Sequence, residues 1–69
     1  MNVRVDRRTR SREAVLDAAA WLLHERGITG AKVAEVMQRA QLAAGSFYLY
    51  FPTKDALLDE VLRRSLAAV

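Results

Sequence analysis

Aliphatic and aromatic side chains recur every three or four residues in this 69-residue chain, in stretches that are separated by a glycine, a short break and the single proline. This spacing places the apolar side chains along one face of an α-helix, so the sequence predicts helices rather than strands. The predicted helices run from about residue 7 to 26, from 32 to 40, from 43 to 50, and from 54 onward. The predicted fold class is therefore all-α, a small helical bundle with two short helices in its middle.

Particular residues mark the ends of these helices. Gly27 is expected to adopt the left-handed conformation that ends the first helix, and Pro52 disfavours helical geometry in the residue before it. Thr53 is expected to cap the amino-terminal end of the last helix through its hydroxyl oxygen. The second and third helices are separated by only about three residues, so a tight turn must join them.

Composition excludes several kinds of protein. The chain has no cysteine and one histidine, so we expect no disulfide framework, no metal site and no cofactor. The longest apolar run, Ala18 to Leu23, is far shorter than the ~20 residues of a membrane span. No paired carboxylates, activated nucleophile or phosphate-binding loop is present, so an enzyme is not expected. These features predict a cytoplasmic domain.

Positive charge is concentrated at the amino-terminal end. Residues 1–12 hold five arginines and one aspartate, whereas residues 13–69 hold six basic and seven acidic residues. Arginine forms bidentate contacts with phosphate groups, so a basic flexible arm over residues 1–8 predicts a polyanionic partner, nucleic acid first and an anionic membrane second. A solvated tail that only aids solubility is the alternative. The arginines that could reach DNA are Arg4, Arg7, Arg8, Arg10 and Arg12.

The two short helices and their turn, residues 32–51, have the length of a DNA-binding helix-turn-helix. In that motif the second helix enters the major groove, and the first lies across the phosphate backbone. Lys32, at the start of the first of these helices, is therefore expected to contact a phosphate.

The stretch VAEVMQRAQLAAGSFYLYFPTKDALLDEV resembles the amino-terminal domain of TetR-type bacterial transcriptional regulators. The resemblance extends over about residues 10–62, and the spacing of tyrosine, phenylalanine and lysine is its most specific part. The matching positions in this stretch are Val36, Ala40, Gly45, Ser46, Tyr48, Phe51, Thr53, Lys54, Asp55 and Leu57. The resemblance implies a homeodomain-like three-helix core followed by the start of a fourth helix, with the DNA-binding domain over residues 9–69.

Two positions in the turn depart from the family pattern. Gln41 stands where the family usually has glycine, so a residue with a side chain must adopt a left-handed or otherwise strained conformation, at a cost of about 1 kcal/mol. Ala43 replaces the serine that commonly caps the recognition helix, with the loss of about 1 kcal/mol of capping. Both changes are expected to lower the stability of the motif rather than alter its identity.

The resemblance assigns DNA contacts to four polar residues. Lys54 is expected to hold a phosphate together with the free N–H groups at the start of the last helix, the alternative being a solvated lysine. Tyr48 and Tyr50 would place their hydroxyls on phosphates or base edges, with the Tyr48 ring partly packed; alternatively, either ring belongs to the edge of the core. Ser46 is expected to contact a phosphate.

The remaining expected contacts are small or apolar. Gly45 allows either a close approach of its backbone to DNA or close packing against the preceding helix. Ala43, Ala44 and Leu49 could contact thymine methyl groups or act as spacers. Few polar side chains are available to read bases, so DNA shape and bridging water are expected to share the recognition. The complete predicted set is Lys32, Ala43, Ala44, Gly45, Ser46, Tyr48, Leu49, Tyr50 and Lys54.

The resemblance implies sequence-specific binding of double-stranded DNA by a transcriptional regulator of the repressor type. Two copies would read a pseudo-palindromic operator. The family's carboxy-terminal domain, which binds a small effector and holds the homodimer, is expected to be absent from this chain, so dimerisation is expected to be weak or absent. The alternative is a helical interaction module whose basic arm docks on an anionic membrane or on a partner protein. Trp21 lies where the family is usually polar, and it could be either exposed or part of an interface.

Overall fold

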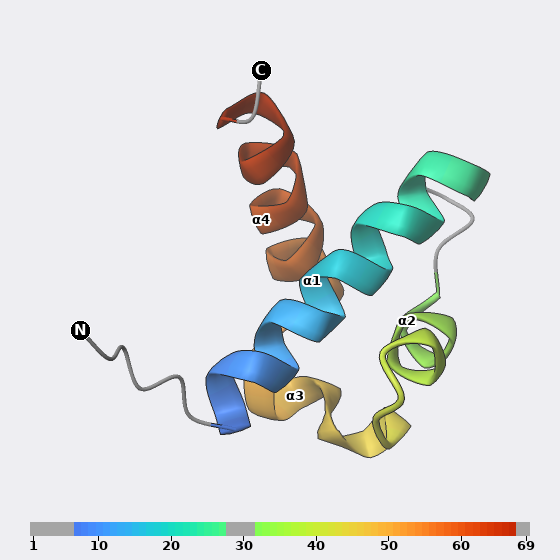
Figure 1. The fold of residues 1–69 in the computed structure, drawn as a ribbon, viewed down its shortest axis with the longest axis vertical. Coiled ribbons are helices and arrows are strands. Elements are labelled where there is room, and N and C mark those ends of the chain that lie inside the picture. The colour runs from blue at the N-terminus through green and yellow to red at the C-terminus, as the bar shows by residue number, and fades with distance from the viewer. Residues whose placement is uncertain (1–6, 28–31, 68–69) are drawn as a thin grey trace.

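The apolar stripes seen in the sequence form helices in a computed structural model, which describes residues 7–27 and 32–67. These residues contain no strand, which confirms the all-α prediction. In chain order the elements are α1 (Arg7–Arg26), α2 (Val33–Arg39), the 3-10 turn η2 (Ala44–Ser46), α3 (Phe47–Tyr50) and α4 (Lys54–Ala67) (Figure 1).

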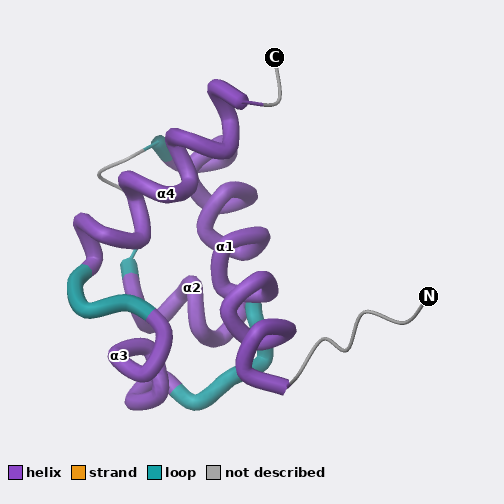
Figure 2. Tube along the Cα trace, turned by 90° about the vertical axis from the view of Figure 1, so that its left-hand side faces the viewer, coloured by secondary structure: helices purple, strands orange, loops and turns teal. Residues whose placement is uncertain are grey.

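The longest helix, α1, is the central element of the bundle. It packs against both α2 and α4 (Figures 1 and 2). In both views α3 lies at the end of the molecule where α1 begins, and the carboxy-terminal end of α4 lies at the opposite end. The helix-turn-helix is therefore presented at one end of the bundle.

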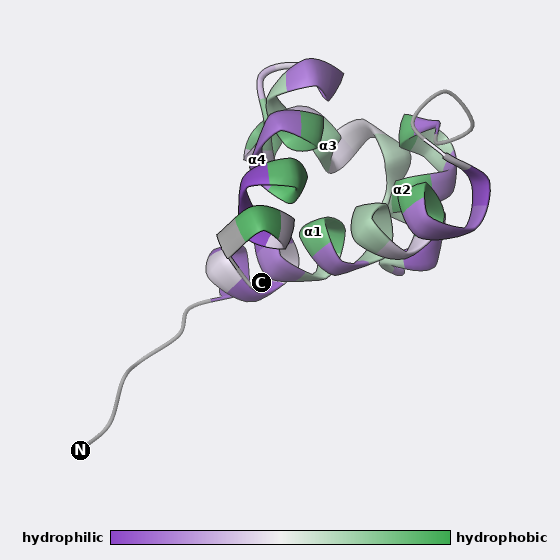
Figure 3. Cartoon of the chain, turned by 90° about the horizontal axis from the view of Figure 1, so that it is seen from above, coloured by the Kyte–Doolittle hydropathy of each residue, from purple (hydrophilic) through white to green (hydrophobic). Residues whose placement is uncertain are grey.

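The core is built from one apolar face of each helix. Hydrophobic and hydrophilic segments alternate along α1, α2 and α4, as expected for helices with one buried face (Figure 3). Helices as short as α2 and α3 are not stable alone in water, so burial of these faces is what stabilises them. The buried side chains are Val15, Leu16, Ala18, Ala19, Leu22, Val36, Met37, Phe47, Phe51, Leu57 and Val61.

The predicted helix ends at Gly27 and Thr53 are confirmed. Gly27 has φ +80°, and its N–H donates to the Leu23 carbonyl at 2.8 Å. The Thr53 hydroxyl accepts the N–H of Ala56 at 3.0 Å, which satisfies one of the free donors at the start of α4.

The turn after α2 contains the predicted left-handed residue. Gln41 has φ 63° and donates its N–H to the Gln38 carbonyl at 3.0 Å, while the Leu42 N–H donates to the Met37 carbonyl at 2.9 Å. This pair of bonds defines a Schellman motif, and Leu42 packs against the core, a contact that frequently accompanies this motif. Gln41 thus adopts the left-handed conformation for which the family usually has a glycine.

The third helix differs from the prediction of an α-helix over residues 43–50. Its first turn is the 3-10 turn η2, and only α3 is α-helical. Ala43 offers no side-chain cap, and the backbone N–H and hydroxyl of Ser46 both donate to the Ala43 carbonyl, at 3.0 and 2.7 Å. Bonds between residues three apart tighten a helix end whose donors have no other partner.

The basic arm lies largely outside the described residues. Arg4 is among residues 1–6, which are not described, whereas Arg7 and Arg8 form the first turn of α1, inside the range predicted for the arm. Within residues 7–27 and 32–67, no helix is long and apolar enough to cross a membrane.

Candidate nucleic-acid interface

Two buried phenylalanines set which face of α3 points toward the core. Phe47 and Phe51 are four residues apart, and their stacked rings lie 5.9 Å apart between centroids. Residues four apart share a helix face, so the two residues that directly follow Phe47 turn away from the core. Tyr48 and Leu49 are accordingly 67% and 63% exposed.

The two tyrosines are packed in the opposite order to the prediction. Tyr50 is the half-buried one and packs against the core, whereas Tyr48 contacts Phe47 only edge-on, at 5.1 Å between ring centroids. The expectation of a partly packed Tyr48 ring is therefore wrong. Tyr50 lies three residues after Phe47 and thus on the same side of the helix, while Tyr48 is the next residue and is turned about 100° away.

The recognition segment, formed by η2 and α3, begins with small residues rather than large side chains. Ala43, Ala44 and Gly45 are exposed. A Cβ added at Gly45 would meet no atom within 4 Å among the described residues, so close packing against α2 does not explain this glycine. The Ser46 hydroxyl already donates to the Ala43 carbonyl, so it would have to rotate to donate to a phosphate.

The two lysines predicted to contact phosphates begin helices. Lys32 occupies the N-cap position of α2 without a side-chain cap bond and is exposed. Lys54 is the first residue of α4 and is half-buried, and the exposed Asp55 follows it in the first turn. Free N–H groups and a lysine at a helix start favour an anion, whereas Asp55 opposes one.

Two arginines proposed for DNA contact bind within the chain instead. Arg8 donates to the Leu49 carbonyl at 2.8 Å. Arg12 donates to both carboxylate oxygens of Glu60, at 2.7 and 2.5 Å, and its guanidinium carbon lies 4.6 Å from the Phe51 ring centroid. The hydrogen bond from Arg12 lowers the pKa of Glu60, and the same bond raises the pKa of Arg12. Sequence reasoning missed this pair because its members are 48 residues apart.

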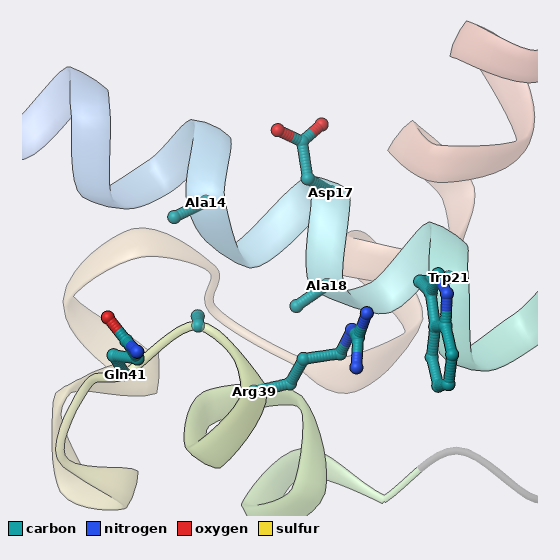
Figure 4. Close-up of a pocket in the computed structure, with 7 residues that line it drawn as sticks. Ala14, Asp17, Ala18, Trp21, Arg39 and Gln41 are labelled. Atoms are coloured by element: carbon teal, nitrogen blue, oxygen red, sulfur yellow. The ribbon is translucent and has the colours of Figure 1, made fainter.

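Trp21 is exposed but not isolated. It is 44% exposed, and the Arg39 guanidinium carbon lies 3.5 Å from its ring centroid, a cation–π contact between α1 and α2 (Figure 4). The pair borders an open hollow of about 410 Å³. The lining residues are Ala14, Asp17, Ala18, Trp21, Arg39, Ala40 and Gln41.

Comparison with known proteins matches residues 15–61 to the family described as bacterial regulatory proteins, tetR family. The chain is 35% identical over 54 residues to the HTH-type transcriptional regulator YvdT of Bacillus subtilis (strain 168), and 38% identical over 52 residues to the HTH-type transcriptional repressor KstR2 of Rhodococcus jostii (strain RHA1). It is also 38% identical over 58 residues to the HTH-type transcriptional repressor NemR of Escherichia coli (strain K12).

The matched stretches make up 78%, 75% and 84% of this chain, but only 28%, 26% and 29% of the respective relatives. The chain therefore spans less than a third of the length of these relatives. No solved structure matches the chain at comparable significance. The alternative of a membrane-docking or partner-docking module finds no support among these relatives.

Proposed function

The chain belongs to the tetR family of bacterial regulatory proteins, and from this premise we propose that residues 32–51 read double-stranded DNA, with η2 and α3 in the major groove. The family is one of transcriptional regulators, so this chain is a DNA-binding regulator domain and not an enzyme.

The observation that carries the proposal is the exposure of Tyr48 and Leu49 on the outer side of α3. Large side chains turned toward water contribute little to the fold, whereas at the position of a recognition helix they contact a partner surface. The buried Phe47 and Phe51 hold these side chains outward, so the exposure follows from how the helix is anchored.

Each exposed group has a chemical role in this proposal. The Leu49 side chain and the methyl groups of Ala43 and Ala44 contact thymine methyl groups, and the Tyr48 hydroxyl bonds to a base edge or a phosphate. Gly45 lets the backbone approach the DNA, because no Cβ stands between them. The residues proposed to hold phosphates are Lys32, Ser46, Tyr50 and Lys54.

We extend the proposal to the intact regulator by its resemblance to this family. Two copies bind a pseudo-palindromic operator, and occupancy of the operator blocks access of RNA polymerase in the bacterial cytoplasm. Homodimerisation and the binding of a small-molecule effector reside in sequence beyond the matched region of the family. Two linked DNA-binding units gain about 10²–10⁴ in avidity, so the 69-residue chain alone binds DNA much more weakly than a dimer.

A salt titration of binding to a random-sequence DNA duplex tests the proposal through Lys54. Each neutralised phosphate contributes about 0.9 to the slope of log K against log salt, so Lys54→Ala should lower the slope by about that amount. Arg63→Ala is the matched control, because it removes one positive charge from the exposed face of α4, where Arg63 pairs with Asp59. An unchanged slope for Lys54→Ala, or an equal loss in both variants, contradicts the proposed orientation on DNA.

A further inference from the structure

The recognition segment is too short to define its own orientation. It consists of the 3-10 turn η2 and four residues of α3, and neither element has a side-chain cap at its amino-terminal end. An isolated helix of this length is not stable in water. The angle at which η2 and α3 meet DNA must therefore be set by contacts with other helices.

Two arginines on one face of α1 supply such contacts at the end of α3. Arg8 and Arg12 are four residues apart, so their side chains lie on the same side of α1. Arg8 donates to the carbonyl of Leu49, in the last turn of α3, where carbonyl groups lack partners within the helix and a cation is favoured. Arg12 lies over the ring of Phe51, the residue at which α3 ends.

Arg12 also joins this contact to α4. Its guanidinium binds both oxygens of Glu60, and about a third of each side chain is exposed. A bidentate pair fixes the direction of both side chains more strictly than a single bond. One guanidinium thus touches the end of α3 on one side and α4 on the other, while remaining attached to α1.

We propose that Arg12, held by Glu60, is a positioning residue for DNA recognition: it fixes the end of α3 at the angle that η2 and α3 need in the major groove. This inference rests on the proposed function, and it removes Arg12 from the set of arginines available for DNA phosphates. Arg8 assists by holding the carbonyl of Leu49 while the Leu49 side chain points outward.

The first test needs no DNA and compares Arg12→Met with Arg64→Met in the 69-residue chain. Arg64 pairs with Glu13 at 2.5 Å and so also joins α1 to α4, but from one turn farther along α4, away from α3. The readout is amide hydrogen exchange of Phe51, whose N–H donates to the Phe47 carbonyl, with Ala40 in the turn after α2 as reference.

Arg12→Met should raise the exchange rate of Phe51 relative to that of Ala40 by about fivefold, while Arg64→Met should leave the ratio unchanged. Dividing the exchange rate of Phe51 by that of Ala40 removes the effect of a change in global stability, because such a change alters both exchange rates by the same factor. An unchanged ratio in Arg12→Met, or an equal rise in both variants, overturns the proposal.

The second test measures selectivity for DNA sequence. The wild-type chain first selects a duplex from a random library, and selectivity is the affinity for this duplex divided by the affinity for a random-sequence duplex. Arg12→Met should lower this ratio by about fivefold and leave the salt slope unchanged, whereas Arg64→Met should change neither. A slope lower by about 0.9 in Arg12→Met means that Arg12 holds a phosphate, which overturns the positioning role.

Arg12→Lys serves as the rescue variant, because it keeps a cation beside Glu60 and Phe51. It should recover part of the selectivity, and a ratio as low as that of Arg12→Met overturns the proposal. Failure of the wild-type chain to select any sequence contradicts the proposed function instead, and the exchange measurement then still decides whether Arg12 holds α3.

Discussion

Replacing Gln41 by glycine should stabilise this protein, although it removes a side chain. Gln41 has φ 63° and occupies the left-handed position of the Schellman motif that ends α2. Its own side chain is exposed, and every bond of the motif is made by backbone groups that glycine retains. The substitution therefore tests backbone conformation with little else changed.

The expected magnitude is a balance of two effects. The left-handed conformation costs a residue with a Cβ roughly 1–2 kcal/mol, and glycine avoids this cost. Glycine also has more conformational freedom in the unfolded chain, which lowers the free energy of unfolding by about 0.5–1 kcal/mol. The substitution is therefore expected to raise the free energy of unfolding by about 0.5–1 kcal/mol, which corresponds to ~2–8 °C in Tm for a domain of this size.

Urea unfolding followed by far-ultraviolet circular dichroism measures the effect, with Gln38→Gly as matched control. Gln38 is also an exposed glutamine, but it lies within α2 in helical conformation. The same chemical change there should lower the free energy of unfolding by about 1 kcal/mol. The two variants should thus change stability in opposite directions.

The reasoning is refuted if Gln41→Gly is no more stable than the wild type while Gln38→Gly is destabilised as expected. That result would mean that the glutamine side chain contributes to the native turn as much as the left-handed conformation costs.

Further predictions concern Gly27, Gly45 and the Arg12–Glu60 pair. Gly45→Ala should raise the free energy of unfolding by about 0.5 kcal/mol, since its Cβ meets no neighbour, whereas Gly27→Ala, at φ +80°, should lower it by about 1 kcal/mol in urea titrations. Gly45→Ala should also weaken DNA binding in fluorescence-anisotropy titrations, and unchanged affinity would contradict a close approach of the backbone to DNA. Because the pKa of Glu60 lies below its ordinary 4.5 in the folded chain, the pair stabilises the fold above that value and loses its contribution as pH falls through the lowered pKa. Urea titrations should therefore show a larger loss between pH 7 and pH 3 for the wild type than for Glu60→Gln, and parallel losses would contradict a stabilising pair.

The residues that end the helices could be identified from the sequence because their effects are local. Gly27, Gln41 and Thr53 act through bonds that span no more than five residues, and each adopts the predicted role. One local prediction is wrong. The sequence predicts an α-helix from Ala43, whereas the structure has a 3-10 turn there and Ala43 provides no side-chain cap. Capping and helix type are decided by differences of about 1 kcal/mol, which residue preferences resolve poorly.

The sequence indicated a DNA-binding helix-turn-helix, which the family match supports, but it did not reveal which side chains pack within that motif. The spacing of residues 32–51 indicates a helix-turn-helix, and the structure leaves Leu49, one of the proposed contact residues, exposed. Which tyrosine is buried depends on how α3 is rotated about its axis relative to the core, and the buried Phe47 and Phe51 set that rotation. The cation–π contact between Trp21 and Arg39 likewise depends on the packing of α1 beside α2, which no local sequence pattern predicts.

By itself, the sequence determined that the fold is helical and where most of its helices begin and end, because hydrophobic periodicity and capping operate within one or two helical turns. The family follows from the residue motif between Val36 and Leu57. Only the tertiary structure decided which partners the arginines of α1 find on other helices. Arg12 meets Glu60 over 48 residues, and Arg8 meets the Leu49 carbonyl over 41. Such pairs follow from the packing of whole helices, which brings together groups that are far apart in the sequence.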